Sequence, residues 1–235
     1  MKNIFLETKN VMAFREAMAS LEDVQKGQPG LAVVWGQAGR GKTVCAQEYA
    51  VHSRAIYLRV MEDWTPRAML GGLCLKINQS NPRTIADCKQ VICAALDVNP
   101  RLIIVDEADR LRNIGMIEHF RDIHDICGVP VVFIGEQSLY PKINSHRRLW
   151  SRVTQAVEFL PICSEDVVLF CLKAAGLRVS GEVAQGLCKR CDGDFRLIWQ
   201  DVRKLENICR ASGVAVVEMS MLKGLPNIKG GGNVN

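Results

Sequence analysis

The most informative segment of the sequence is Leu31-Ala-Val-Val-Trp-Gly-Gln-Ala-Gly-Arg-Gly-Lys-Thr43. Its apolar first half predicts a buried strand, and Gly36-x-x-x-x-Gly41-Lys42-Thr43 is a complete phosphate-binding loop pattern. Glycines let the backbone curl so that successive N–H groups face a phosphate. The next residues, 44–51, are typical of a helix, whose positive N-terminal end would face the same phosphates. This strand–loop–helix context favours a nucleotide site over a chance match to the pattern.

The residues of this loop have distinct expected roles. Lys42 would reach the β- and γ-phosphates and act in catalysis, while the hydroxyl of Thr43 would bind Mg²⁺. A nucleotide and Mg²⁺ are therefore predicted ligands. The positions expected around the phosphates are Gly36, Gln37, Ala38, Gly39, Arg40, Gly41, Lys42, Thr43 and Val44.

A second motif follows at Arg101-Leu-Ile-Ile-Val-Asp106-Glu107, an apolar run that ends in two acids. Asp106 can hold the Mg²⁺ indirectly, through the groups that bind the ion. Glu107 can orient and deprotonate an attacking water. A strand that merely ends in an acidic turn is the alternative. The occurrence of both motifs in one chain favours a site that hydrolyses a nucleotide, with Glu107 as its base.

Length and composition allow an ordinary globular protein. The chain has 235 residues, of which 48% are hydrophobic and 6% aromatic. This is enough for one α/β core and a small appended domain. The ten cysteines are scattered, and Cys188-x-x-Cys191 lacks the second pair or the two histidines that a zinc site would need. We therefore expect these two cysteines to pack in a core.

The location of the protein is predicted from what the sequence lacks. No apolar stretch is long enough to span a bilayer, and the N-terminus does not resemble a signal peptide. We therefore expect a cytoplasmic protein with no membrane partner. The net charge of +5 is a mild indication of a nucleic-acid partner, although a solvated basic surface would also account for it.

The chain changes character near residue 160. Before it, apolar strand-like runs at 31–35, 54–60, 101–107, 129–135 and 153–159 alternate with helix-like segments. This alternation predicts a parallel sheet with helices on both faces. After it come only helix-like segments at 164–175, 180–190 and 194–211, with one further element at 214–222. The expected domains are 1–160, with an N-terminal helix at 9–26, and 161–226. The glycine-rich tail, 227–235, is predicted to be disordered.

With these elements in place, the chain resembles the AAA+ ATPases from its N-terminal helix to about residue 226. The resemblance implies an α/β fold, namely a P-loop AAA+ core with a parallel five-stranded sheet flanked by helices, followed by a small all-helical lid domain. It also implies that the nucleotide is ATP, that Mg²⁺ is the metal cofactor, and that the chain is an ATPase.

The family places further residues around its nucleotide. A polar sensor residue stands at the tip of the fourth strand. Here Glu136 departs from the pattern and Gln137 could take the role instead, so the position stays open. Ser151-Arg152-Val153 matches the place of the arginine finger, a catalytic residue that reaches the nucleotide of a neighbouring subunit. Arg147 and Arg148 are alternatives, and all three could instead form a solvated basic face.

The lid of the family carries a second sensor arginine at the start of a late helix. Gly193-Asp194-Phe195-Arg196 resembles that motif, which makes Arg196 a candidate nucleotide ligand. A capped helix with a surface arginine is the alternative.

Within the AAA+ group, the chain is similar to transposition ATPases of the phage Mu B type. The turn at 134–140 and the element at 146–153 suggest this likeness. It implies sequence-nonspecific binding of duplex DNA, ATP-dependent self-assembly into a ring or helical filament, and delivery of target DNA to a transposase. Hydrolysis would then drive disassembly. Candidate DNA contacts are Arg67, Lys76, Arg83 and Lys89, each of which could equally be an ordinary exposed helix charge.

Two other functions remain open. One is an AAA+ ATPase coupled to secretion or another membrane process, which usually carries a membrane segment or a further domain. The other is a nucleotide-dependent scaffold or signalling module with little turnover, against which Glu107 argues.

Overall fold

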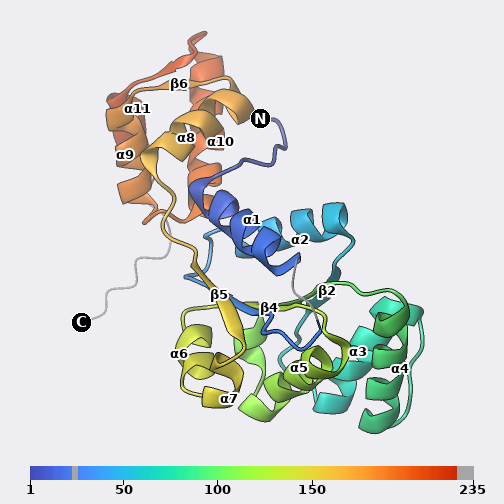
Figure 1. Cartoon of the computed structure of the whole chain (residues 1–235). Coiled ribbons are helices and arrows are strands. Elements are labelled where there is room, and N and C mark those ends of the chain that lie inside the picture. The colour runs from blue at the N-terminus through green and yellow to red at the C-terminus, as the bar shows by residue number, and fades with distance from the viewer. Residues whose placement is uncertain (23–25, 227–235) are drawn as a thin grey trace. The chain divides into compact units, whose positions relative to one another are not determined.

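The computed structural model describes residues 1–22 and 26–226 (Figure 1). The predicted disordered tail, 227–235, lies outside these residues. The chain divides into two compact units. The first, called the core unit below, contains residues 10–37 and 41–159. The second, called the lid unit, contains residues 1–9, 38–40 and the segment from Leu160 onward. The first nine residues and the middle of the phosphate loop thus group with the C-terminal segment, unlike in the predicted domains.

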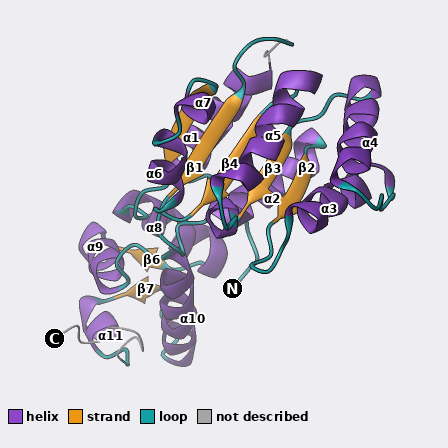
Figure 2. Ribbon diagram, turned by 90° about the horizontal axis from the view of Figure 1, so that it is seen from below, coloured by secondary structure: helices purple, strands orange, loops and turns teal. Residues whose placement is uncertain are grey.

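The core unit contains a five-stranded parallel sheet in the order β2-β3-β4-β1-β5 (Figure 2). This confirms the predicted sheet. Because the strands are parallel, their carboxyl ends meet at one edge, which is where the two sequence motifs come together. The strands are β1 (Leu31–Trp35), β2 (Ile56–Arg59), β3 (Ile103–Asp106), β4 (Val131–Gly135) and β5 (Val153–Glu158).

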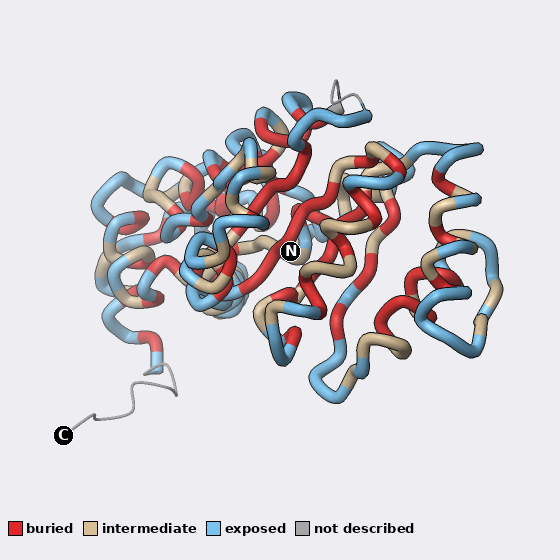
Figure 3. Tube along the Cα trace, turned by 60° about the horizontal axis from the view of Figure 1, so that its bottom comes forward, coloured by how far each residue is buried: buried red, intermediate tan, exposed pale blue. Residues whose placement is uncertain are grey.

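Helices cover both faces of this sheet, as Figure 1 shows. Successive strand residues point to opposite faces, so Val33 and Phe133 lie in one apolar cluster while Val34 and Ile134 lie in the other. The first cluster is completed by α3 (Pro66–Asn78), α4 (Ile85–Val98), α5 (Ile114–Cys127), α6 (Leu139–Asn144) and α7 (Arg147–Trp150). The second is completed by α1 (Lys9–Glu22) and α2 (Lys42–Ser53). Figure 3 shows the central strands as continuous runs of buried residues.

Local sequence explains where several helices begin. Thr65, Thr84 and Asn113 each accept a backbone N–H of the first turn of α3, α4 and α5, which satisfies a donor that the helix itself cannot pair. The segment between β4 and β5 contains two short helices, α6 and α7. His146 between them has an extended conformation, with φ −106° and ψ 96°, which interrupts the helix.

The lid unit is mainly helical and follows the predicted segments closely. Its elements are α8 (Ser164–Phe170), the π-helical turn η2 (Cys171–Ala175), β6 (Arg178–Val179), α9 (Gly181–Arg190), α10 (Phe195–Ala211), β7 (Val216–Val217) and α11 (Met219–Lys223). The expectation of an all-helical lid needs one correction. β6 and β7 pair in parallel, with Arg178 opposite Val216. Two-residue strands are too short to show a period in the sequence.

The lid unit has its own apolar core, which includes Leu187, Val202 and Leu205. Cys191 is buried beside it, and burial raises the pKa of its thiol to about 12. Cys188 lies at the margin of the same cluster. In residues 1–22 and 26–226, no three His, Cys, Asp or Glu side chains gather as a metal site. None of the helices in these ranges has both the length and the apolar composition needed to cross a bilayer.

Candidate nucleotide-binding site

The phosphate loop leaves β1 at the carboxyl edge of the sheet and enters α2 at Lys42. Gly36 has φ +150°, and a Cβ there would collide with the backbone oxygen of Phe159. Gly41, the last residue before the helix, has φ +93°. Both conformations favour glycine, so the glycines of the motif are required by the path of the chain. Val44 follows in the first turn of α2 with an exposed side chain.

Lys42 closes the loop on itself. Its Nζ donates to the backbone oxygens of Gly36 at 2.6 Å and Gln37 at 2.8 Å. Burial lowers the pKa of Lys42, and nearby carboxylates, with Glu136 and Asp106 the strongest, oppose this effect. A bound nucleotide would replace the two carbonyl contacts with phosphate oxygens. The hydroxyl of Thr43 forms no hydrogen bond in the described part of the chain, so it is available to a metal ion.

Asp106 ends β3 and is buried, with 2% of its surface exposed. Its Oδ2 accepts a 2.6 Å hydrogen bond from the hydroxyl of Tyr57 on β2, and its Oδ1 accepts the backbone N–H of Glu107 at 2.9 Å. Gln47 of α2 donates to the same Tyr57 oxygen at 3.3 Å. Burial, followed by the bond to Asp106, raises the pKa of Tyr57, which keeps the hydroxyl protonated as a donor. The orientation of the Asp106 carboxylate is thus fixed on both sides.

Glu107 has a left-handed backbone conformation, with φ +58°, at the start of the short helix η1 (Ala108–Arg110). Such a conformation is strained for a residue other than glycine and is common at active sites. Oε1 of Glu107 lies 3.0 Å from Nη2 of Arg59, and Oε2 lies 3.1 Å from Nε of Arg110. Both oxygens of the expected catalytic base are therefore held in ion pairs.

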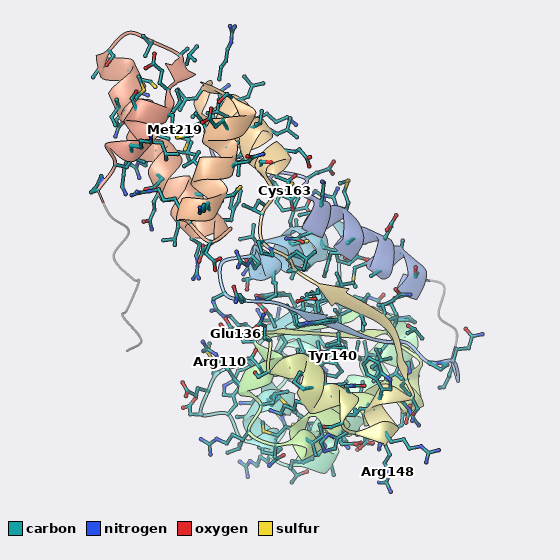
Figure 4. The ribbon with its side chains drawn as sticks, turned by 90° about the vertical axis from the view of Figure 1, so that its left-hand side faces the viewer. Arg110, Glu136, Tyr140, Arg148, Cys163 and Met219 are labelled. Atoms are coloured by element: carbon teal, nitrogen blue, oxygen red, sulfur yellow. The ribbon has the colours of Figure 1, made fainter. Side chains whose placement is uncertain are left out.

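The tip of β4 carries the two sensor candidates. Glu136 and Gln137 are both exposed. The backbone N–H of Glu136 donates to Oδ1 of Asp109 at 2.9 Å, and Gly135 has no room for a Cβ because this carboxylate packs against it. Glu136 and Arg110 lie on the same side of the core unit in Figure 4. The charge of the Glu136 carboxylate favours a raised pKa of Lys42, against the effect of burial. Gln137 forms no side-chain hydrogen bond within the described residues.

Arg152 stands at the opposite edge of the sheet. Its backbone oxygen accepts the N–H of Leu31, the first residue of β1, whereas the phosphate loop follows the last residue of that strand. A strand of five residues is about 16 Å long, so Arg152 does not reach the loop of its own subunit. Its Nε lies 2.6 Å from Oδ1 of Asp125.

The two alternative arginines lie on α7. Arg147 and Arg148 are exposed and have no ion-pair partner among residues 1–22 and 26–226. Figure 4 shows the side chain of Arg148 projecting outward from the core unit. These two side chains are therefore free to meet another molecule, whereas Arg152 would first have to leave Asp125.

In the lid unit, the first turn of α10 contacts the middle of the phosphate loop. The N–H of Phe195 donates to the backbone oxygen of Gly39 at 2.9 Å. Asp194 caps the helix by accepting the N–H groups of Arg196 and Leu197, and a Cβ on Gly39 would collide with the Asp194 carboxylate. The guanidinium of Arg196 lies 3.3 Å from Asp194, and 66% of its side-chain surface is exposed.

The side chain of Arg40, one of the positions expected around the phosphates, contacts the lid unit. The residue is 6% exposed, and its guanidinium donates to the backbone oxygen of Asp192 and lies 3.5 Å from the Asp192 carboxylate. This side chain holds a turn of the lid unit.

The four DNA candidates do not form one free surface. Nζ of Lys89 pairs with Asp122 at 2.7 Å. Arg67 holds the loop before α4, donating to Oδ1 of Asn81 at 2.9 Å and to the backbone oxygen of Arg83 at 3.0 Å. Lys76 and Arg83 are exposed, with no ion pair in the described ranges. Half of the candidate set thus has an intramolecular role that the sequence did not reveal.

Sequence reasoning missed Tyr57, Arg59, Arg110 and Asp109. The register of the sheet accounts for the first two, because β2 pairs with β3 so that Arg59 stands opposite Asp106. If β2 and β3 had been predicted to be neighbours, Tyr57 and Arg59 would have been expected near Asp106 and Glu107.

The chain is similar in sequence to several known proteins. Residues 25–143, about half of the chain, match the AAA domain family. A Mu-like prophage DNA transposition protein B of Haemophilus influenzae is 28% identical over 174 residues, which cover 64% of this chain and 60% of that protein. A potential ATP-binding protein of Staphylococcus aureus is 23% identical over 260 residues, with 93% of this chain and 94% of that protein covered.

Solved structures support the fold. The structure of Drosophila ORC bound to DNA is similar with a TM-score of 0.63 and 16% identity, over 95% of this chain and 61% of that one. The Aeropyrum pernix ORC2 protein gives a TM-score of 0.65 and 12% identity, over 95% and 69%. The chain therefore spans about 60% of the length of the transposition protein and of the Drosophila chain.

Proposed function

The chain belongs to the AAA domain family of P-loop ATPases, and from this premise we propose that it assembles on duplex DNA in an ATP-dependent manner and delivers that DNA to a transposase. The observation that carries the nucleotide part of the proposal is the meeting of Lys42, Asp106 and Glu107 at one edge of the sheet. The cytoplasm is where such a protein would meet its DNA, and it is the location that we propose.

The residues of the loop fit ATP and Mg²⁺. The backbone N–H groups of residues 36–44 and the ammonium of Lys42 would hold the phosphates. Thr43 and Asp106 would hold Mg²⁺, which would neutralise charge on the phosphate oxygens. Glu107 would accept a proton from the attacking water. Gln137 or Glu136 from β4 and Arg196 from α10 would sense the nucleotide.

Self-assembly is proposed from the position of the arginines. Arg152 stands at the edge of the sheet that is remote from its own phosphate loop, and Arg147 and Arg148 precede it in α7. A guanidinium there could stabilise transition-state charge only in the site of another subunit. ATP would then favour a ring or a helical filament, and hydrolysis would dissolve it.

Binding of DNA and of a transposase is supported by the relatives. One relative is named as a DNA transposition protein, and one structural neighbour was solved with DNA. The net charge of +5 suits contacts to phosphates, which carry little sequence information. Lys76, Arg83, Arg67 and Lys89 remain candidates for these contacts, and the first two form no ion pair in the part of the chain that the structure describes.

One observation favours a second function. Both oxygens of Glu107 are paired with arginines, which suits a nucleotide-dependent scaffold with little turnover. Slow hydrolysis with and without DNA would point to this second function.

The proposal is tested by measuring ATP hydrolysis and DNA binding together. Labelled duplex DNA of arbitrary sequence is titrated with the full chain, with and without a non-hydrolysable ATP analogue, and hydrolysis is followed with and without the same DNA. We expect analogue-dependent binding and DNA-stimulated hydrolysis. The absence of nucleotide-dependent binding at low salt would overturn the transposition proposal and leave an AAA ATPase with another client.

A further inference from the structure

The helix α10 separates its charges between two faces. Its two acids, Asp201 and Glu206, point inward, with 1% and 12% of their side-chain surface exposed. Its arginines at positions 196, 203 and 210 are all exposed. The seven-residue spacing places them on one line along the helix, about 10 Å apart. An exposed row of three arginines therefore runs along one side of α10.

The inward acids are already neutralised. Asp201 pairs with Arg190 at 2.8 Å and with Lys204 at 2.8 Å. Glu206 accepts from the amino group of Met1 at 2.7 Å and also contacts Arg210 at 3.2 Å. Arg203 forms no ion pair within 4.0 Å in the described residues, although its charge contributes, after the amino group of Met1 and Arg210, to lowering the pKa of Glu206.

An aromatic side chain lies between the arginines. Trp199 is 38% exposed, and the guanidinium carbon of Arg203 lies 5.5 Å from the centroid of its ring. This cation–π contact orders both side chains on the surface. An exposed indole beside a guanidinium can contact the sugars of a nucleic acid while the guanidinium binds its phosphates.

We propose that Trp199, Arg203 and Arg210, called the α10 surface below, bind the sugar–phosphate backbone of duplex DNA. The inference rests on the proposed function and adds a DNA contact in the lid unit to the candidates in α3, in α4 and between them. Arg203 and Arg210 each neutralise one phosphate, and Glu206 keeps the amino group of Met1 as its partner when Arg210 contacts DNA. Arg196, at the beginning of the same line, remains with the nucleotide.

The charge pattern explains why the partner is a nucleic acid. A row of guanidinium groups without an intervening exposed carboxylate complements a polyanion whose charges repeat along a line. A folded acidic protein presents mixed charges and would not need this regular spacing. The experiment below distinguishes DNA from a second copy of the chain as the partner of this surface.

The test compares two double variants of the full chain that lose the same charge. Arg203→Ala with Arg210→Ala removes the proposed contacts. Lys173→Ala with Arg178→Ala is the matched control, since both residues are exposed in the lid unit and unpaired in the part of the chain that the structure describes. Binding of labelled duplex is measured by fluorescence anisotropy with a non-hydrolysable ATP analogue over a series of salt concentrations. Binding of a fluorescent ATP analogue shows that each variant is folded.

We expect the α10 double variant to bind DNA roughly tenfold more weakly. The plot of log affinity against log salt should become less steep by about 1.8 per bound subunit, since each of the two phosphates contributes about 0.9. The control should change neither quantity by a comparable amount. Trp199→Ala should weaken binding without changing the slope, and Trp199→Phe should restore most of it.

The outcomes separate this inference from the proposed function. If the unaltered chain does not bind DNA, the proposed function fails. If it binds and the α10 double variant binds with the same affinity and slope, the α10 surface is not the DNA contact and the proposed function stands. If the double variant loses ATP-dependent self-assembly in the absence of DNA, measured by sedimentation, the α10 surface contacts a second copy and the inference is overturned.

Discussion

The hydroxyl of Tyr57 on β2 lies 2.6 Å from Oδ2 of Asp106 at the end of β3. A tyrosine thus donates to the carboxylate that we propose as a holder of Mg²⁺. Since Gln47 of α2 donates to the same hydroxyl, one short chain of hydrogen bonds joins the helix after the loop to the acidic motif. Mg²⁺ would have to share Asp106 with this chain or displace the hydroxyl.

Replacing Tyr57 with phenylalanine tests this relationship. The variant leaves one oxygen of a buried carboxylate without its donor, which should lower the free energy of unfolding by about 1–3 kcal/mol when no metal is present. Mg²⁺ should recover part of this loss, because the free oxygen can then face the metal. Urea unfolding with ATP, with and without Mg²⁺, measures both effects. Equal stability of the variant and the unaltered chain without Mg²⁺ would contradict the structural role of Tyr57.

Arg59→Gln should raise hydrolysis in the absence of DNA. Arg59 holds one oxygen of Glu107 at 3.0 Å, and about half of its side chain is exposed. An ion pair at such a position is worth up to about 1 kcal/mol, so its loss should raise the rate by up to about fivefold. The measurement is steady-state ATPase activity at saturating ATP. A fall in rate with unchanged ATP affinity would instead mean that Arg59 orients Glu107 for catalysis.

Lys42→Ala and Glu107→Gln should separate binding from hydrolysis. Lys42→Ala removes the ammonium of the phosphate loop and should abolish tight ATP binding. Glu107→Gln keeps the shape of the side chain and should preserve binding while lowering the hydrolysis rate roughly 100-fold or more, because a general base is lost. Equilibrium binding and single-turnover hydrolysis distinguish the two variants. Normal hydrolysis by Glu107→Gln would show that another residue is the base.

Arg152→Ala should preserve ATP binding by the monomer and lose ATP-dependent assembly or hydrolysis. Because Arg152 also pairs with Asp125, Asp125→Asn is the control that breaks the pair and keeps the arginine. If the role of Arg152 were merely structural, both variants would behave alike. Mixing Arg152→Ala with Glu107→Gln protein should recover some turnover at interfaces that combine the two intact residues. If Arg152→Ala assembles and hydrolyses normally, the exposed Arg147 and Arg148 are the next candidates.

Much of this site could be predicted from the sequence because its signals are local. The loop at 36–43 and the acids at 106–107 each follow an apolar run directly, so their place at the ends of strands needs no knowledge of the rest of the fold. The parallel sheet also follows from the alternation of strands and helices.

The remaining features depend on contacts between distant segments. That Arg59 stands beside Asp106 depends on the choice of β3 as the neighbour of β2, which no local pattern specifies. The burial of Arg40 depends on a turn of the lid unit about 150 residues later in the chain. The parallel pairing of β6 with β7 likewise joins two short segments that carry no period of their own.

The N–H of Phe195, at the beginning of α10, donates a hydrogen bond to the backbone oxygen of Gly39 in the phosphate loop. The helix can therefore pivot at this contact. The helix has 17 residues and is therefore about 25 Å long. If the loop changes shape around a nucleotide, a tilt of about 5° at this contact moves the far end of the helix, near Arg210, by about 2 Å. That displacement is comparable with the length of a hydrogen bond. A small rearrangement of the loop would thus move the far end of α10 far enough to form or break a contact there.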